Sequence, residues 1–100
     1  EYVLSPARIS KATAKKAEYV ALKVSKAFKH VGLLAVELFL TKEGEIWVNE
    51  VAPRPHNSGH YSIEACLTSQ FQQHIRSIFN LSLGDTRHSG SAIMLNIVDN

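Results

Sequence analysis

The sequence predicts a mixed α+β fold with few strands, because helix-like and strand-like patterns follow one another along its 100 residues. Apolar residues recur at helical spacing within residues 11–31 and again within 67–79. Two apolar runs on either side of a short polar turn, within 33–51, indicate a β-hairpin. A last strand is expected over residues 91–98.

The first predicted helix has a start signal and a stop signal. Ser10 is a suitable N-cap, and Gly32 is expected to close the helix. Six lysines lie within residues 11–29, but they are spread along the helix without interleaved aromatic residues. With a net charge of only +2, this pattern indicates a solvated helix face rather than a nucleic-acid site.

The remaining segments connect these elements. Residues 52–61 contain two prolines and a glycine and are predicted to form a loop. The second helix should start near Thr68 or Ser69 and end just before Asn80. A hairpin with one further strand makes a thin sheet whose edges need partners. We therefore expect residues 1–100 to be a single partial domain of a larger body.

Composition restricts the class of protein. Apolar residues make up 45% of the chain, which is enough for a hydrophobic core and argues against disorder. The single cysteine, Cys66, excludes an intrachain disulfide and fits a reducing compartment. No apolar run approaches membrane-spanning length. A cytoplasmic location is expected, with neither membrane nor nucleic acid as partner.

The predicted hairpin places two glutamates opposite each other. If Thr41 pairs with Ile46 across the turn, the alternation of the strands brings Glu37 opposite Glu50. Directly opposed residues have Cβ atoms roughly 4.5–5.5 Å apart, and like charges at that separation are destabilising. A proton, a basic side chain or a bound cation would relieve the repulsion.

The expected surroundings of the two acids are compatible with a bound cation. The same register pairs Phe39 with Val48 on that face, so apolar neighbours would limit screening by solvent. Magnesium is bound well by carboxylate oxygens when substrate phosphates complete its coordination shell. The alternative is an open sheet face on which both acids are simply hydrated.

A donor-rich loop follows the second acid. Arg54 lies between two prolines, which restrict its backbone, and its guanidinium is a planar fork of donors suited to carboxylate, carbonate or phosphate. Gly59 allows close approach of the backbone. The polar side chains of the loop are His56, Asn57, Ser58 and His60. Their density beside an acid pair indicates a site that binds an anion.

Zinc is the alternative ligand for the two loop histidines. His56 and His60 are four residues apart, but they would need to share one face of a helix, and Pro55 and Gly59 argue against a helix there. The isolated histidines are interpreted as surface or structural residues; they are His30, His74 and His88. Cys66 is interpreted as a small core residue.

These motifs resemble those of a known family. The string VELF at 36–39, a short turn and VNEVAPR at 48–54 together resemble the metal-binding hairpin of ATP-grasp enzymes. The continuation PHNSGH at 55–60, followed by LTSQF at 67–71, is similar to the 5-(carboxyamino)imidazole ribonucleotide synthases of that superfamily. The resemblance extends to IMLN at 93–96 and implies part of an ATP-grasp domain, with helix, hairpin, helix and strand on an antiparallel sheet.

The resemblance implies an activity in purine biosynthesis. ATP would phosphorylate bicarbonate to carboxyphosphate, and the exocyclic amine of aminoimidazole ribonucleotide would capture the activated carbon. Magnesium, or manganese, would accompany ATP. The remainder of the ATP-grasp enzyme would be a necessary partner, and the parent enzyme would be a homodimer.

The resemblance also implies roles for individual residues. The metal ligands would be Glu37 and Glu50. The nucleotide site would contain Phe39, Asn49 and Glu50. Bicarbonate or carboxyphosphate would be handled by Arg54 and His56. The ribonucleotide pocket would be lined by Asn57, Ser58 and His60.

The sequence departs from the family pattern in two respects. Ala52 occupies a position where many ATP-grasp enzymes carry an asparagine, which removes one possible metal or phosphate contact. The phosphate-binding lysines and glycine-rich loop of the family do not occur in this sequence. We therefore expect the chain to be the carboxy-terminal half of the core and to be inactive alone.

Two other functions are considered. The formate-dependent glycinamide ribonucleotide transformylases, also ATP-grasp enzymes, have a similar Pro-Arg-Pro-His stretch, but they would carry aspartate and threonine after it. Asn57, Ser58 and His60 favour the synthases. A noncatalytic α+β interaction module would lack the opposed acids and would be a stable monomer of 100 residues.

Overall fold

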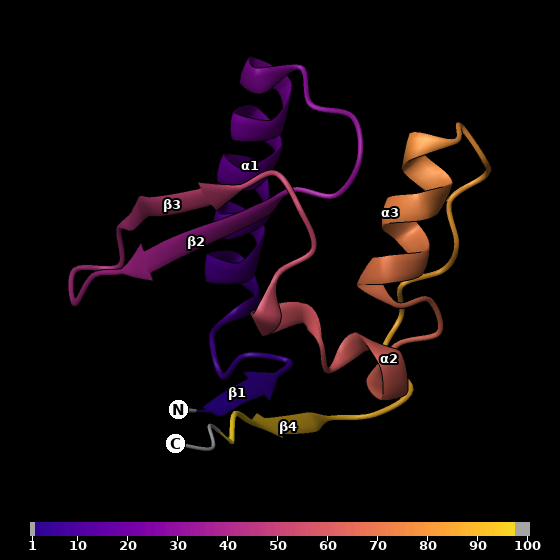
Figure 1. Ribbon diagram of the computed structural model, residues 1–100. Helices are drawn as coiled ribbons and strands as arrows, with labels where there is room; N and C mark the ends of the chain where they lie inside the picture. Colours follow the sequence, from indigo (N-terminus) through magenta and orange to yellow (C-terminus); the bar gives the residue numbers. More distant parts are fainter. Residues whose placement is uncertain (1, 98–100) are drawn as a thin grey trace.

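The computed structural model of the protein describes residues 2–97. The hairpin lies against the long first helix, and the first and last strands lie side by side at one end (Figure 1). The mixed α+β class and the helix–hairpin–helix–strand order are as predicted. In chain order the helices and strands are β1 (Tyr2–Ser5), α1 (Lys11–Phe28), β2 (Ala35–Leu40), β3 (Ile46–Ala52), α2 (Ser62–Ala65), α3 (Gln70–Ile78) and β4 (Ala92–Leu95).

The strands form two separate antiparallel pairs instead of one thin sheet. β2 pairs with β3 as the predicted hairpin, whereas β4 pairs with β1. The register of the second pair places Tyr2 opposite Leu95 and Ser5 opposite Ala92. The strand before Ser10 is not predicted from the sequence, because a four-residue strand carries too little alternation to be recognised. Consequently the partner of the last strand was missed.

Helix α1 begins as predicted but ends earlier. The Ser10 hydroxyl accepts a hydrogen bond from the backbone N–H of Thr13, at 3.1 Å, as an N-cap does. The helix ends at Phe28, and Lys29 takes the left-handed conformation with its N–H bonded to the Lys26 carbonyl. The expectation that Gly32 closes the helix is therefore wrong. Gly32, with a φ of +106°, instead turns the chain toward β2.

Helix α3 holds the loop between α1 and β2. It begins with a capping box formed by Ser69 and Gln72, near the predicted start, and a left-handed Asn80 follows its end. The His74 ring accepts the backbone N–H of Leu33 through Nδ1 at 2.9 Å, and the Ser77 hydroxyl accepts that of Gly32 at 3.1 Å. His74 is thus a structural histidine, as interpreted from the sequence.

The segment predicted as a loop between the hairpin and the second helix contains helical turns. A 3₁₀ turn covers Asn57–Gly59, and α2 follows after two further residues. The turn is made by the N–H groups of Gly59 and His60, which bond to the carbonyls of His56 and Asn57. Such single turns lie below the length at which hydrophobic spacing can predict a helix.

Much of the apolar surface of the described residues is exposed. The buried hydrophobic residues are Ala52 and Ala65, and no large side chain of the described part is fully buried. Phe28 and Phe79 keep 66% and 68% of their surface accessible. Among residues 2–97, no helix combines the length and apolar character needed to cross a membrane. The exposed apolar residues lie on several elements, so their burial requires contacts on several faces.

We expect the isolated 100-residue chain to self-associate or to unfold with a small free energy, because its exposed apolar side chains favour burial. Size-exclusion chromatography with light scattering over a range of concentrations measures the association, and urea unfolding measures the free energy. A concentration-independent monomer with a cooperative unfolding free energy of about 5–15 kcal/mol, usual for a native domain, would contradict this expectation.

Candidate functional site

A β-bulge brings the two glutamates of the hairpin onto one face. Leu38 pairs with Val48, but the next residue of β2, Glu37, pairs with Glu50. Asn49 is therefore an extra residue on β3. An unbroken ladder would have paired Glu37 with Asn49 and turned Glu50 to the opposite face. The predicted opposition of the two acids is confirmed, and the bulge is its cause.

Between the turn and the bulge the predicted register is wrong by one residue. Ile46 pairs with Leu40 instead of Thr41, and Phe39 pairs with Trp47 instead of Val48. The turn is wider than assumed, because the N–H of Thr41 bonds to the carbonyl of Glu45. The bulge then compensates for this offset before the acids are reached. The one-residue offset that the wider turn introduces is thus reversed by the bulge, so the two acids are paired as predicted.

The apolar neighbours of the acids are aromatic. Phe39 and Trp47 share the face that carries Glu37 and are 55% and 58% exposed. The Trp47 indole N–H donates to the Glu45 carboxylate at 3.0 Å. Sequence reasoning missed Trp47 because only the true register places it beside Phe39. The pair forms an exposed aromatic surface next to the acids.

Both carboxylate oxygens of Glu37 have a polar neighbour. The Asn49 amide donates to Oε2 at 3.3 Å, and the Nε2 atom of His56 lies 3.2 Å from Oε1. The Asn49 contact is a consequence of the bulge, which projects this side chain toward the acids. Both contacts come from residues that were predicted from the sequence to belong to the site. They fix the orientation of one carboxylate of the opposed pair.

The contacts of His56 determine which ring nitrogen carries its proton. The backbone N–H of Ser58 donates to Nδ1 at 3.2 Å, and the Ser58 hydroxyl lies 2.8 Å from the same atom. Nδ1 therefore acts as an acceptor, which places the ring hydrogen on Nε2, the nitrogen that lies 3.2 Å from Glu37. The His56 side chain is only 17% exposed, so this arrangement is well shielded from solvent.

A small cavity adjoins these residues. Its volume is about 190 Å³, and it lies where the hairpin, the loop after it and the β1–β4 pair meet. Its lining residues are Tyr2, Val3, Glu37, His56, Asn57, Ser58, Met94 and Asn96. Four of these were predicted from the sequence as site residues. The other four come from β1, from β4 and from Asn96 just after it, and they were not predicted as site residues because the pairing of those strands was not recognised.

Five of the predicted site residues do not line this cavity: Phe39, Asn49 and Glu50 of the hairpin, and Arg54 and His60 of the loop. The Arg54 side chain is exposed, and its Nη1 atom donates to the Pro55 carbonyl at 3.1 Å. His60 stacks on Phe71, with ring centroids 5.5 Å apart, while His56 contacts Glu37. The two loop histidines therefore have different surroundings, which does not fit a shared zinc ion.

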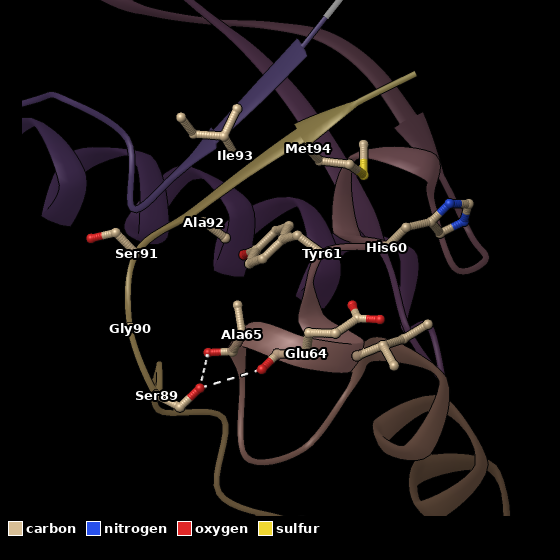
Figure 2. Close-up of a pocket in the computed structure, with 11 residues that line it drawn as sticks. His60, Tyr61, Glu64, Ala65, Ser89, Gly90, Ser91, Ala92, Ile93 and Met94 are labelled. Atoms are coloured by element: carbon tan, nitrogen blue, oxygen red, sulfur yellow. Dashed lines mark hydrogen bonds between the residues drawn. The ribbon is translucent and has the colours of Figure 1, made fainter. Parts of the chain in front are cut away.

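A second, larger cavity of about 570 Å³ contains His60 in its lining. Figure 2 shows it between the segment at residues 60–65 and the chain leading into β4. The Ser89 hydroxyl joins these two walls, donating to the carbonyls of Glu64 and Ala65. His60 is thus placed at a different cavity from Asn57 and Ser58, although the sequence grouped the three.

The donor set of the acid pair fits magnesium better than a transition metal. Among residues 2–97, no group of three or more histidine, cysteine, aspartate or glutamate side chains is arranged to hold a metal ion. Magnesium typically takes one or two carboxylates and completes its shell with water and substrate phosphates. Glu37 and Glu50, opposed on one exposed face, provide two such carboxylates.

Comparison with known proteins shows the family. The family model described as the ATP-grasp domain matches residues 1–71, and the chain belongs to the ATP-grasp family. Among curated proteins, it is 50% identical over 93 residues to the N5-carboxyaminoimidazole ribonucleotide synthase of Bacillus subtilis. This match covers 93% of the chain and 24% of the relative, so the chain spans about a quarter of that protein's length.

Solved structures agree with this relationship. The N5-carboxyaminoimidazole ribonucleotide synthetase of Thermotoga maritima is 56% identical with a TM-score of 0.95, over 97% of this chain and 27% of that one. The Aspergillus clavatus N5-carboxyaminoimidazole synthase, in complex with ADP and 5-aminoimidazole ribonucleotide, is 41% identical with a TM-score of 0.96. That match covers 100% of this chain and 28% of the fungal one.

Proposed function

We propose that the chain forms the carboxy-terminal half of the catalytic core of an ATP-dependent carboxylase in purine biosynthesis. Its substrates would be 5-aminoimidazole ribonucleotide, bicarbonate and ATP. The observation that carries the proposal is the opposition of Glu37 and Glu50 beside a cavity lined by His56, Asn57 and Ser58. Relatives named for this reaction support it, as does the fungal structure with ADP and the ribonucleotide.

The acid pair would hold magnesium, or manganese, together with the ATP phosphates. When bound, the ion would neutralise charge on the phosphates and turn the repulsion between Glu37 and Glu50 into joint coordination. Asn49 would keep Glu37 oriented through its 3.3 Å hydrogen bond. Phe39 would pack near the adenine, and its exposed partner Trp47 extends the apolar surface available there.

The loop after β3 would hold the anion derived from bicarbonate. A bicarbonate oxygen would attack the γ-phosphorus of ATP, which gives ADP and carboxyphosphate. His56 would link the anion site to the metal site, because its ring already contacts Glu37. Arg54 would turn its fork of donors from the Pro55 carbonyl toward the anion when substrate binds.

The ribonucleotide would then accept the carboxyl group. Its exocyclic amine would attack the carboxyphosphate carbon, forming the N–C bond while the C–O bond to phosphate breaks and the amine loses a proton. Asn57 and Ser58 would contact this substrate from the small cavity, and His60 from the larger one. We further propose that the complete enzyme is a cytoplasmic homodimer.

The proposed reaction is tested with the complete enzyme that contains this segment. ADP release should require both aminoimidazole ribonucleotide and bicarbonate, and ¹³C-bicarbonate should label the product. Formate with glycinamide ribonucleotide is the comparison, because it would reveal the transformylase activity of the alternative ATP-grasp family. An enzyme that uses only the latter pair, or neither pair, would contradict the proposal.

Glu50→Gln in the complete enzyme should abolish turnover and greatly weaken binding of Mg-ATP, because one of the two carboxylates that hold the ion is lost. The fold should persist, since removing one charge relieves the repulsion between opposed acids. Titration with nucleotide at varied magnesium concentration measures the binding, and circular dichroism measures the fold.

Glu43→Gln is the matched control for that substitution. It makes the same charge change on the exposed turn of the same hairpin, away from the acid pair, and should leave Mg-ATP binding unchanged. The metal assignment fails if Glu50→Gln binds Mg-ATP like the wild type, or if both variants lose binding equally.

Arg54→Ala should reduce kcat/KM for bicarbonate by at least about 30-fold, because a charge-assisted contact to the anion is worth on the order of 2–5 kcal/mol. ATP binding should change little. Arg54→Lys should recover only part of the loss, since lysine keeps the charge but not the planar fork. Steady-state kinetics at varied bicarbonate concentration measure the change in kcat/KM, and Arg8→Ala, at an exposed position, is the control. Wild-type dependence on bicarbonate in Arg54→Ala would rule the role out.

A further inference from the structure

We propose that Gln70 is a positioning residue of the site, which sets the backbone of His56 and through it the ring that contacts Glu37. The role in catalysis rests on the proposed function, whereas the placement of the ring can be measured without it. Gln70 is the first residue of α3 and is only 9% exposed. A buried amide needs partners for both its oxygen and its nitrogen.

The Gln70 side chain pairs with the backbone of His56 through two hydrogen bonds. The His56 N–H donates to Oε1 at 3.0 Å, and the amide nitrogen donates to the His56 carbonyl at 2.8 Å. The orientation of the amide is unambiguous, because a backbone N–H can bond only to the oxygen. The Gln70 side-chain amide thus bonds both backbone groups of His56, as a neighbouring strand would do in a sheet.

Contacts with Ser62 and Gly59 hold Gln70 in the position that this pair requires. The Ser62 hydroxyl accepts the Gln70 backbone N–H at 2.9 Å and donates to the Gly59 carbonyl. A Cβ atom on Gly59 would lie 2.5 Å from Oε1 of Gln70 and 2.8 Å from its Cδ. Gly59 is therefore required because the Gln70 amide fills the space beside it, and a methyl group there would push the amide away from His56.

The consequence for the ring follows from the geometry. With its backbone held, His56 receives the Ser58 N–H on Nδ1 and presents Nε2 to Glu37. Loss of the Gln70 pair would free the backbone of the loop, and the ring would no longer keep one proton arrangement or one direction. Gln70 touches neither the small cavity nor the acids itself, so it acts only through His56.

The same helix carries a matched control. Gln73, one turn further along α3, makes the same kind of pair with the backbone of Gly84: the Gly84 N–H donates to Oε1 at 2.8 Å, and Nε2 donates to the Gly84 carbonyl at 3.2 Å. That pair holds the connector before β4 and has no contact with His56. Substitution of Gln73 therefore removes the same kind of hydrogen-bonded pair without changing a contact of His56.

The test compares Gln70→Glu with Gln73→Glu in the complete enzyme. Glutamate keeps an acceptor for the backbone N–H but places a second acceptor against the carbonyl, which breaks half of the pair at constant size. Gln70→Glu should reduce kcat/KM for bicarbonate by about 10–100-fold, as loss of an outer partner typically does. Gln73→Glu should stay within about twofold of the wild type, a difference of roughly 0.4 kcal/mol.

A second readout does not require activity. In ¹⁵N-histidine-labelled protein, assigned with a His56→Gln variant, the two His56 ring nitrogens should show distinct shifts, with the proton on Nε2. Gln70→Glu should bring these shifts together, and Gln73→Glu should not. If the wild type fails to carboxylate the ribonucleotide, the proposed function fails while these shifts still test the placement.

Gly59→Ala provides an independent approach to the same contact, and it keeps the test valid if Gln70→Glu does not fold. It should merge the His56 ring shifts and lower kcat/KM for bicarbonate as Gln70→Glu does. The inference is overturned if the folded Gln70 or Gly59 variant keeps the wild-type ring shifts and kcat/KM, or if Gln73→Glu changes both to the same extent.

Discussion

The opposition of Glu37 and Glu50 across the hairpin is the constraint on which the site depends. Two like charges in direct cross-strand register destabilise a sheet unless they are compensated. Here the compensation is local for one acid, because Asn49 donates to Glu37 and the Nε2 atom of His56 lies 3.2 Å from its carboxylate. A shared divalent cation would compensate both. The bulge at Asn49 serves the two requirements at once, since it aligns the acids and supplies one of the donors.

Side chains rather than a strand hold the loop that follows the hairpin. The loop contains two prolines, which cannot donate a backbone hydrogen bond, so it is poorly suited to a sheet ladder. The side-chain amide of Gln70 replaces the missing partner at His56, and the Ser62 hydroxyl connects the backbone N–H of Gln70 to the Gly59 carbonyl. A polar network of this kind orders a loop without burying much apolar surface, which suits a site open to ligands.

The exposed apolar residues are consistent with the relation to longer proteins. The chain spans 24–28% of the Bacillus, Thermotoga and Aspergillus relatives, and its described elements leave large apolar side chains accessible on several faces. Such surfaces are normally covered in a folded protein. The proposed carboxylase would bury them against the rest of its core, and the acid pair would then lie at an internal nucleotide site.

The sequence alone determined the features that depend on neighbouring residues. Helical periodicity, the caps at Ser10 and Ser69, and the pattern of the hairpin are local, so the helices, the hairpin and the candidate acids could be predicted. Only the tertiary structure decided what depends on contacts between distant segments. The pairing of β1 with β4 brings Met94 and Asn96 to the small cavity, and nothing within either four-residue strand specifies its partner. The bulge and the separation of His60 from Asn57 likewise follow from packing, because a single inserted residue or one helical turn redirects a side chain without changing the hydrophobic pattern.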